Sequence, residues 1–215
     1  MNNIVQVRLD GTPEQTARLR QLQVAFAEVC NTIAPVVQQT RCWNRVALHH
    51  LLYRQLRERF PAMGSQMVCN AIYSVSRSAR VVLQHPASPW NVNKLGDAPL
   101  PHLRFADTAP VYFDRHTLSL KNGGLSMFTL DGRMRFELRL APDDEARFQR
   151  DRLLEVLLAA DAQGYHLTFR FAEGEAATTA AADDQLPEYV LVLPANAAPD
   201  FSHQLDARPV AVNAP

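Results

Sequence analysis

The first periodic stretch of the chain covers residues 4–9, where apolar and polar side chains alternate. The apolar members are Val5, Val7 and Leu9. A period of two residues is typical of a half-buried β-strand. Because a single strand is not stable alone, we expect this one to pair with strands that come later in the chain.

Three helices are predicted next. Thr12 and Gln15 stand at the two positions of a capping box around Pro13, which fits the first helical position. The apolar positions of this helix recur at helical spacing: Leu19, Leu22, Phe26, Val29 and Ile33. We expect Pro35 to kink or end the helix, since proline has no backbone N–H to donate.

A second helix is predicted over residues 43–60, ending before Pro61, and a third from a cap at Ser65. One side of the second helix carries Val46, His49, Tyr53, Leu56 and Phe60. The third has a regular apolar stripe of Val68, Ile72, Val75, Ala79 and Val82. Residues 86–110 show no periodicity and are predicted to be a long connection.

The second half of the chain has the pattern of strands and turns. Segments 116–121, 125–130 and 133–140, joined by Asn-Gly-Gly and Asp-Gly turns, predict a three-stranded meander. A helix is expected from Pro142 through the leucines at 153–158 to Gly164. Two more strands are predicted, over residues 165–171 and 189–193. We expect segment 172–186 to be a mobile loop and the chain from residue 194 to be disordered.

These elements predict an α+β fold. Because the first strand must pair with the later ones, the helices form an insertion after it. We therefore expect an antiparallel, barrel-like β-domain made of residues 1–11 and 105–194, a helical insertion of residues 12–104, and a disordered tail of residues 195–215.

The 215-residue chain has no apolar run of the roughly 18 residues that a membrane span requires, and its start lacks the apolar core of a signal peptide. We expect a cytoplasmic protein without a membrane partner.

The formal charge is zero but unevenly spread: residues 1–115 carry 13 Lys and Arg against 7 Asp and Glu, and residues 171–215 carry one Arg against 7 acids. Arginine supplies 20 of the 22 cations. Arginine suits phosphate contacts, so the basic half is consistent with a nucleic-acid surface; an arginine-biased genome is the alternative.

The sequence offers little for catalysis. Asp10 follows the first strand in an Asp-Gly-Thr string, which occurs in haloacid-dehalogenase-type phosphatases. In those enzymes the nucleophilic aspartate stands two residues before this string, where the chain has Arg8. A two-metal nuclease of the RNase H type would also use a carboxylate here, but the later strands offer only Asp131 and Glu137 as further ligands. We expect no cofactor. Cys42 with His49 and His50 matches no zinc spacing, so no metal site is predicted either. The three cysteines are expected to be buried thiols.

The polar side of the third helix is the strongest candidate for recognition. Gln66, Asn70, Tyr73 and Arg77 lie on one face at successive turns. Amide, phenol and guanidinium groups read base edges, stack on bases or bind phosphates, although the same residues could form a solvated helix face. The second helix has a similar ambiguity, since its arginines could serve only to keep it soluble.

Several strings along the chain have the order found in one known family. They are RLDGTPEQ (residues 8–15), Leu19, Phe26 and Cys30-Asn31, PAMGSQ (61–66), AIYSV (71–75), PVYF (110–113), LSL (118–120), DGR (131–133), GYHLTFR (164–170) and YVLVLP (189–194). This arrangement resembles the amino-terminal half of TnpB (OrfB) proteins, which are transposon-encoded RNA-guided nucleases related to compact type V CRISPR effectors. The resemblance implies a β-barrel wedge domain interrupted by a helical recognition domain.

The resemblance also implies binding roles. Gln66, Asn70, Tyr73 and Arg77 would contact the DNA motif beside the target. Six arginines would hold nucleic-acid backbone: Arg41, Arg45, Arg54, Arg57, Arg133 and Arg135. The partners would be a guide RNA and double-stranded target DNA or an RNA–DNA heteroduplex. No Gly-Ile-Asp-x-Gly string of the RuvC nuclease domain follows Leu193, so we expect no cleavage; a separate RuvC-containing nuclease subunit and self-association are further candidates for partners.

The sequence therefore predicts a non-catalytic nucleic-acid-binding protein. Two alternatives stay open. One is a protein-interaction module, an inhibitor or assembly partner of an RNA-guided nuclease, which would use the acidic stretch 172–188. The other is a metal-dependent phosphoesterase that would use Asp10.

Overall fold

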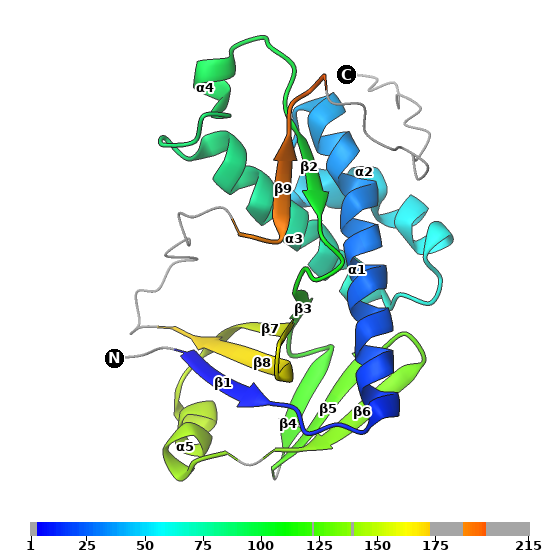
Figure 1. The fold of residues 1–215 in the computed structure, drawn as a ribbon, viewed down its shortest axis with the longest axis vertical. Helices are drawn as coiled ribbons and strands as arrows, with labels where there is room; N and C mark the ends of the chain where they lie inside the picture. The colour runs from blue at the N-terminus through cyan, green and yellow to red at the C-terminus, as the bar shows by residue number, and fades with distance from the viewer. Residues whose placement is uncertain (1–3, 122, 139, 173–186, 197–215) are drawn as a thin grey trace, which may run out of the picture.

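A computed structural model of the chain describes residues 4–121, 123–138, 140–172 and 187–196. The predicted mobile loop 172–186, apart from its first residue, and the predicted tail from residue 197 onward lie outside the described residues. The fold is α+β with antiparallel sheets (Figure 1). None of the helices in the described ranges is both long enough and apolar enough to cross a membrane.

The first strand, β1 (Ile4–Arg8), is the edge of a four-stranded antiparallel sheet. It pairs with β8 (Gly164–Phe171), which pairs with β7 (Leu153–Asp161), and β7 pairs with β3 (Val111–Phe113). The predicted pairing of the first strand with a later one is confirmed. The main helices lie between β1 and the next strand in sequence, so the insertion topology follows from this pairing.

The predicted meander is confirmed as a separate sheet of β4 (Leu118–Lys121), β5 (Gly124–Thr129) and β6 (Gly132–Glu137). Strands β2 (His102–Phe105) and β9 (Val190–Leu193) form a third, two-stranded sheet. Over the described residues the three sheets are not closed into a barrel, because the edge strands of the meander pair with no strand of another sheet. The barrel-like detail of the predicted fold is therefore not seen.

Helix α1 (Pro13–Thr40) begins with the predicted capping box: the Gln15 amide donates to Thr12 Oγ1 over 3.2 Å, and the Thr12 amide donates to the Gln15 side chain over 2.9 Å. The helix does not end at Pro35. Proline costs about 3 kcal/mol inside a helix. Here its neighbours Val36 and Val37 are buried, and their burial offsets that cost.

Helices α2 (Arg45–Arg59) and α3 (Ser65–Gln84) follow. The apolar stripe predicted for α3 is buried, although its N-cap is Gly64 and not Ser65. The side predicted for α2 is only partly right: Leu56 is buried, but Val46 is 62% exposed, because the buried row is rotated toward two leucines that the prediction left out. The buried row is Leu48, Leu52 and Leu56.

Two further predictions are wrong. The helix expected to reach Gly164 stops early as α5 (Pro142–Arg150), and residues 153–161 form β7. The spacing of the leucines there fits both a helix and a strand. Pairing with β8 selects the strand, which buries Val156 and Leu158. The connection 86–110 also contains the short helix α4 (Val92–Leu95) and strand β2.

Gln23 ties α1 to the sheet from inside the core. Its side chain is fully buried, and Nε2 donates to the carbonyl oxygens of Thr108 and Ala109 at 2.9 and 3.2 Å. The hydroxyl of Tyr165, on β8, donates to Gln23 Oε1 at 3.0 Å. One amide thus satisfies groups from α1, from the approach to β3 and from β8, and this network fixes the helix on the sheet.

We predict that Gln23→Leu lowers the free energy of unfolding by about 2–4 kcal/mol, because two carbonyls and one hydroxyl lose their buried partner. Tyr165→Phe should cost only about 1–2 kcal/mol. Chemical denaturation followed by circular dichroism measures both. The double variant should cost less than the sum of the two, and strict additivity would contradict a shared network.

Candidate functional site

The face of α3 that carries the predicted DNA-contacting residues does not face solvent. It packs against β3, and the side chains meet the sheet in what we call the α3–sheet seam: Gln66, Asn70, Tyr73 and Arg77 from α3, with Tyr112, Asp114 and Glu155 from the sheet. Gln66 Nε2 donates to Asp114 Oδ2 at 2.6 Å. Asn70, which is 6% exposed, donates through Nδ2 to the backbone oxygen of Tyr112 at 3.0 Å.

The other two predicted residues converge on Glu155 of β7. Arg77 NH1 donates to Glu155 Oε1 at 2.7 Å, and the Tyr73 hydroxyl lies 3.5 Å from the same oxygen. Arg170 of β8 approaches the second carboxylate oxygen at 3.8 Å. The Glu155 side chain is only 10% exposed, so one buried carboxylate binds two guanidinium groups and a phenol. The structure therefore brings all four predicted residues together, but as an internal seam; the interpretation as a solvated helix face is wrong.

The seam holds its tyrosines in the neutral form. Burial raises the pKa of Tyr112 well above the usual value, and the neighbouring Tyr189 adds to the shift. Burial also raises the pKa of Tyr73, followed by the charge of Glu155. Burial alone lowers the pKa of Arg77, but the nearby Tyr112 and Glu155 outweigh this and raise it. At neutral pH the seam consequently contains phenol donors, a cationic Arg77 and no phenolate.

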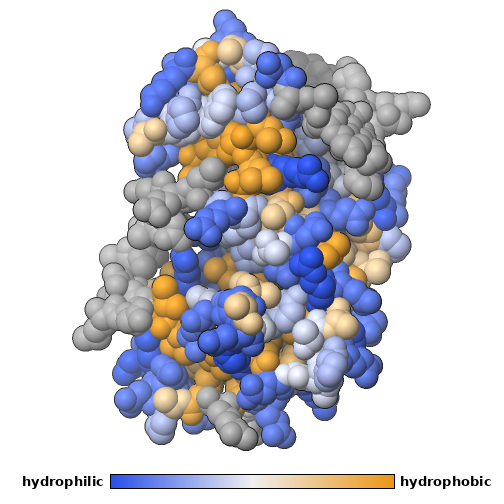
Figure 2. Space-filling model, viewed as in Figure 1, coloured by the Kyte–Doolittle hydropathy of each residue, from blue (hydrophilic) through white to orange (hydrophobic). Residues whose placement is uncertain are grey.

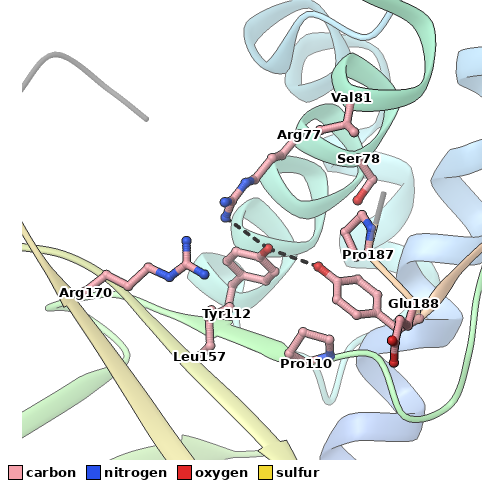
Figure 3. A pocket seen from close by; sticks show the side chains of 10 residues that line it. Arg77, Ser78, Val81, Pro110, Tyr112, Leu157, Arg170, Pro187 and Glu188 are labelled. Carbon is pink, nitrogen blue, oxygen red and sulfur yellow. Dashed lines mark hydrogen bonds between the residues drawn. The ribbon is translucent and has the colours of Figure 1, made fainter. Parts of the chain in front are cut away.

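A pocket opens at one end of the seam (Figure 3). Its volume is about 270 Å³, and its walls come from α3, β3, β7, β8 and the residues that precede β3 and β9. Within it, Arg77 NH1 lies 3.3 Å from the Tyr112 hydroxyl, which lies 3.4 Å from that of Tyr189. The lining residues are Arg77, Ser78, Val81, Pro110, Tyr112, Leu157, Arg170, Pro187, Glu188 and Tyr189.

The pocket is lined mainly by hydrogen-bond donors and apolar side chains. Among its described lining residues there is neither histidine nor cysteine. Guanidinium and phenol groups instead offer several hydrogen-bond donors to a small ligand that carries acceptors. The pocket is slightly smaller than the usual range for small-molecule sites, which starts at about 300 Å³.

The six arginines predicted to hold backbone lie on α2, on β6 and just after α1. Arg41 donates to the carbonyl oxygens of Ala98 and Gly96 at 3.0 and 2.7 Å. Arg45 stands 5.2 Å from the centre of the Tyr73 ring. Arg57 donates to the backbone oxygen of Met63. These partners are neutral, so they hold the side chains in place without cancelling their charge.

The meander carries the other members of this set. Arg133 donates to the Ser126 side chain at 3.1 Å, and Arg135 is exposed. Arg54 alone among the six is paired with a carboxylate, Glu58, at 3.0 Å. Within the described ranges, the other five form no ion pair: Arg41, Arg45, Arg57, Arg133 and Arg135. Elsewhere on the sheets and α5, Arg8, Arg18 and Arg150 are bound to Asp161, Asp131 and Asp151.

Residues proposed for other chemistry are placed as follows. Cys30 is buried, as predicted, and burial raises the pKa of its thiol far above the usual value; Cys42 and Cys69 are only partly buried. Asp10 is exposed in the turn between β1 and α1. In the part of the chain that the structure describes, His, Cys, Asp and Glu side chains do not gather in threes that could hold a metal ion.

Sequence reasoning missed the sheet side of the seam. Glu155, Tyr112, Tyr189 and Arg170 were not predicted to have a site role, although all four contribute to the seam or the pocket. A weak signal existed for Glu155, because it is an acid within an otherwise apolar segment. Assigning that segment to a helix hid its position opposite α3.

We predict that Glu155→Gln lowers the free energy of unfolding by about 2–4 kcal/mol, because it removes the buried carboxylate charge that Arg77 binds in the seam. Glu58→Gln, which breaks the exposed pair with Arg54, is the matched control and should cost less than about 1 kcal/mol. Urea denaturation measures both. Equal losses would mean that the seam carboxylate contributes no more than a surface ion pair.

A second prediction concerns alkaline pH. Folding raises the pKa of Tyr112, so the folded state keeps a proton that the unfolded chain releases above about pH 10. Below that pH, Tyr112 makes its full contribution to the free energy of unfolding. As the pH rises further, the free energy of unfolding falls by up to about 1.4 kcal/mol per pH unit. Tyr112→Phe should flatten the fall measured between about pH 9.5 and 11. An unchanged slope would contradict the burial of a neutral phenol.

Comparison with known proteins adds no assignment. A scan of the sequence against protein-family models finds no match, and a search of curated proteins finds none either. The function must consequently be argued from the placement of charged and polar residues described above.

Proposed function

We propose that the protein is a non-catalytic nucleic-acid-binding protein. In this proposal it resembles the wedge and recognition parts of a TnpB-like RNA-guided nuclease. It acts with a guide RNA on double-stranded DNA or an RNA–DNA heteroduplex, and a RuvC-containing nuclease subunit is a further candidate partner. Arginines would hold the phosphate backbone, and base pairing to the guide would supply sequence specificity.

The observation that carries the proposal is the division of the arginines into two groups. Those bound to carboxylates, such as Arg8 and Arg150, have their charge compensated within the protein. Of the five backbone candidates named above, four retain theirs because their contacts are to carbonyl oxygens, a hydroxyl or an aromatic ring, and Arg135 is exposed and forms no ion pair within the described residues. Uncompensated guanidinium groups held by neutral partners are available to phosphates at little further cost.

The topology is consistent with the proposal. The TnpB resemblance implies a β-domain interrupted by helices after its first strand, and β1 pairs with β8 across such an interruption. The three sheets are not closed into a barrel, so the support comes from the order of the elements alone.

The assignment of Gln66, Asn70, Tyr73 and Arg77 to a DNA motif stays a prediction. Their polar groups already bind Asp114, Tyr112 and Glu155, so DNA would have to replace these contacts. We therefore rest the proposal on the arginines and not on the seam.

The test compares two double variants that remove the same charge. Arg45→Gln with Arg135→Gln alters two uncompensated arginines, and Arg8→Gln with Arg150→Gln alters two that are bound to carboxylates. We expect the first pair to weaken binding to labelled RNA and DNA and to reduce the slope of log affinity against log salt by about 0.9 per lost phosphate contact on duplex DNA. The second pair should change the slope by less than half as much.

Fluorescence anisotropy across a salt series gives both quantities. Absence of binding to RNA and to DNA at low salt would overturn the proposal. Equal effects of the two pairs would show that net charge, and not these arginines, drives binding. Purification from the native host separates the rival: recovered nucleic acid supports the proposal, whereas a bound protein without nucleic acid would favour an interaction module.

A further inference from the structure

The meander presents one apolar and one polar face. Alternate residues of β4, β5 and β6 point into the core, and the buried set is Leu118, Leu125, Met127, Met134 and Phe136. The residues between them point outward. On that outward face one position breaks the polar pattern: Phe128 of β5 is 38% exposed.

Phe128 is paired with an arginine. Phe128 and Arg133 are directly opposite each other in the β5–β6 register, and the Arg133 guanidinium carbon lies 4.2 Å from the centre of the phenyl ring. NH1 of the same guanidinium donates to the Ser126 hydroxyl at 3.1 Å. The arginine thus lies against the ring and is held there by a neutral group, so the pair is a preformed aromatic and cationic surface.

Most of the other charged residues on the outward face are basic. Arg135 lies opposite Ser126 and next to Arg133 on the same face of β6, and Lys121 ends β4 on the third strand. Lys121, Arg133 and Arg135 are exposed, with Glu137 as the acid on this face. Two arginines and a lysine against one glutamate give the described part of this face a net positive charge; Arg133 and Arg135 lie near the ring, and Lys121, which pairs with Gly124, lies about four residues further along the sheet. Figure 1 shows the meander beside the N-terminal end of α1.

An exposed phenylalanine alone is ordinary on a protein surface. The combination here is specific, because bases stack on aromatic rings and on guanidinium planes, while cations along the same strands hold the phosphates. Only a single strand exposes the faces of its bases; a duplex hides them in its own stack. The face therefore fits single-stranded nucleic acid better than a duplex.

Resting on the function proposed above, we propose that the outward face of the meander binds a single-stranded segment of nucleic acid. One base stacks on the Phe128–Arg133 pair, Arg135 holds the adjoining phosphate, and Lys121 holds a phosphate further along the strand. This assigns Phe128, which no charge argument identifies, as the residue that distinguishes single strands from duplexes.

The test uses fluorescein-labelled single strands of about 12 nucleotides, oligo(dT) and oligo(U), and a duplex of the same length. Phe128→Leu should weaken binding to the single strands by about 5- to 100-fold, the range for loss of one stacked base, and leave duplex binding unchanged. Leu191→Ala, at an apolar side chain that is 50% exposed on β9, is the control and should change neither. The surface beside β9 is visibly apolar (Figure 2).

Two further variants keep the result interpretable. Phe128→Trp should retain binding, and its added fluorescence, measured against the background of Trp43 and Trp90, should be quenched by oligo(dT). Arg133→Lys preserves the charge but not the plane, so it should weaken single-strand binding without changing the salt slope.

The outcomes separate the two proposals. If the unaltered protein binds no nucleic acid, both fail. If it binds, but Phe128→Leu binds single strands as tightly as the unaltered protein and oligo(dT) does not quench Phe128→Trp, the stacking site is overturned and the arginine-based function stands. An equal loss for single strands and duplex in Phe128→Leu also overturns the site, since it indicates damage to the fold of the face.

Discussion

The pairing of β1 with β8 determines the path of the rest of the chain. Val5 and Val7 lie opposite Phe169 and Leu167 in this pair, and all four are buried. A slip by one residue would turn the two valines to solvent, so the register is strongly fixed. The capping box at Thr12 comes only four residues after the end of β1, which places the start of α1 beside the meander.

Helix α1 then connects the two ends of the molecule. Its 28 residues span about 42 Å at the rise of an α-helix. Near its start, Arg18 is bound to Asp131 in the β5–β6 turn. Further along, Asn31 exchanges two hydrogen bonds with the backbone of Phe105 on β2, at 2.9 and 2.7 Å. The helix continues past Pro35, and Gln38 in this last part donates to the carbonyl oxygen of Leu100 at 3.1 Å. This hydrogen bond adds to the burial that offsets the cost of proline inside the helix.

The local elements were mostly predictable from the sequence, and their partners were not. The capping box, the apolar stripe of α3 and the Asp-Gly turn of the meander depend on neighbouring residues, so spacing alone identifies them. Residues 153–158 fit both the helical and the strand period. Their conformation depends on pairing with β8, and residue spacing carries no information about that partner. The same limit applies to the site: Gln66, Asn70, Tyr73 and Arg77 were correctly placed on one face, but nothing local indicates that Glu155 lies opposite them.

This limit has a physical origin that also identifies where recognition can lie. Amide, phenol and guanidinium groups satisfy a buried carboxylate as well as they satisfy a base or a phosphate, so residue type on a helix face does not distinguish a seam from a ligand site. What distinguishes them is the charge left after the internal contacts are counted. The charge of Arg77 is balanced by Glu155. Arg133 instead lies against the Phe128 ring and donates to the Ser126 hydroxyl, so its charge stays uncompensated at the surface. Under the proposed function, a polyanion gains most where the protein has fixed a cation without neutralising it; Arg45 and Arg57 on α2 and Arg133 on the meander meet that condition, and Arg77 in the seam does not.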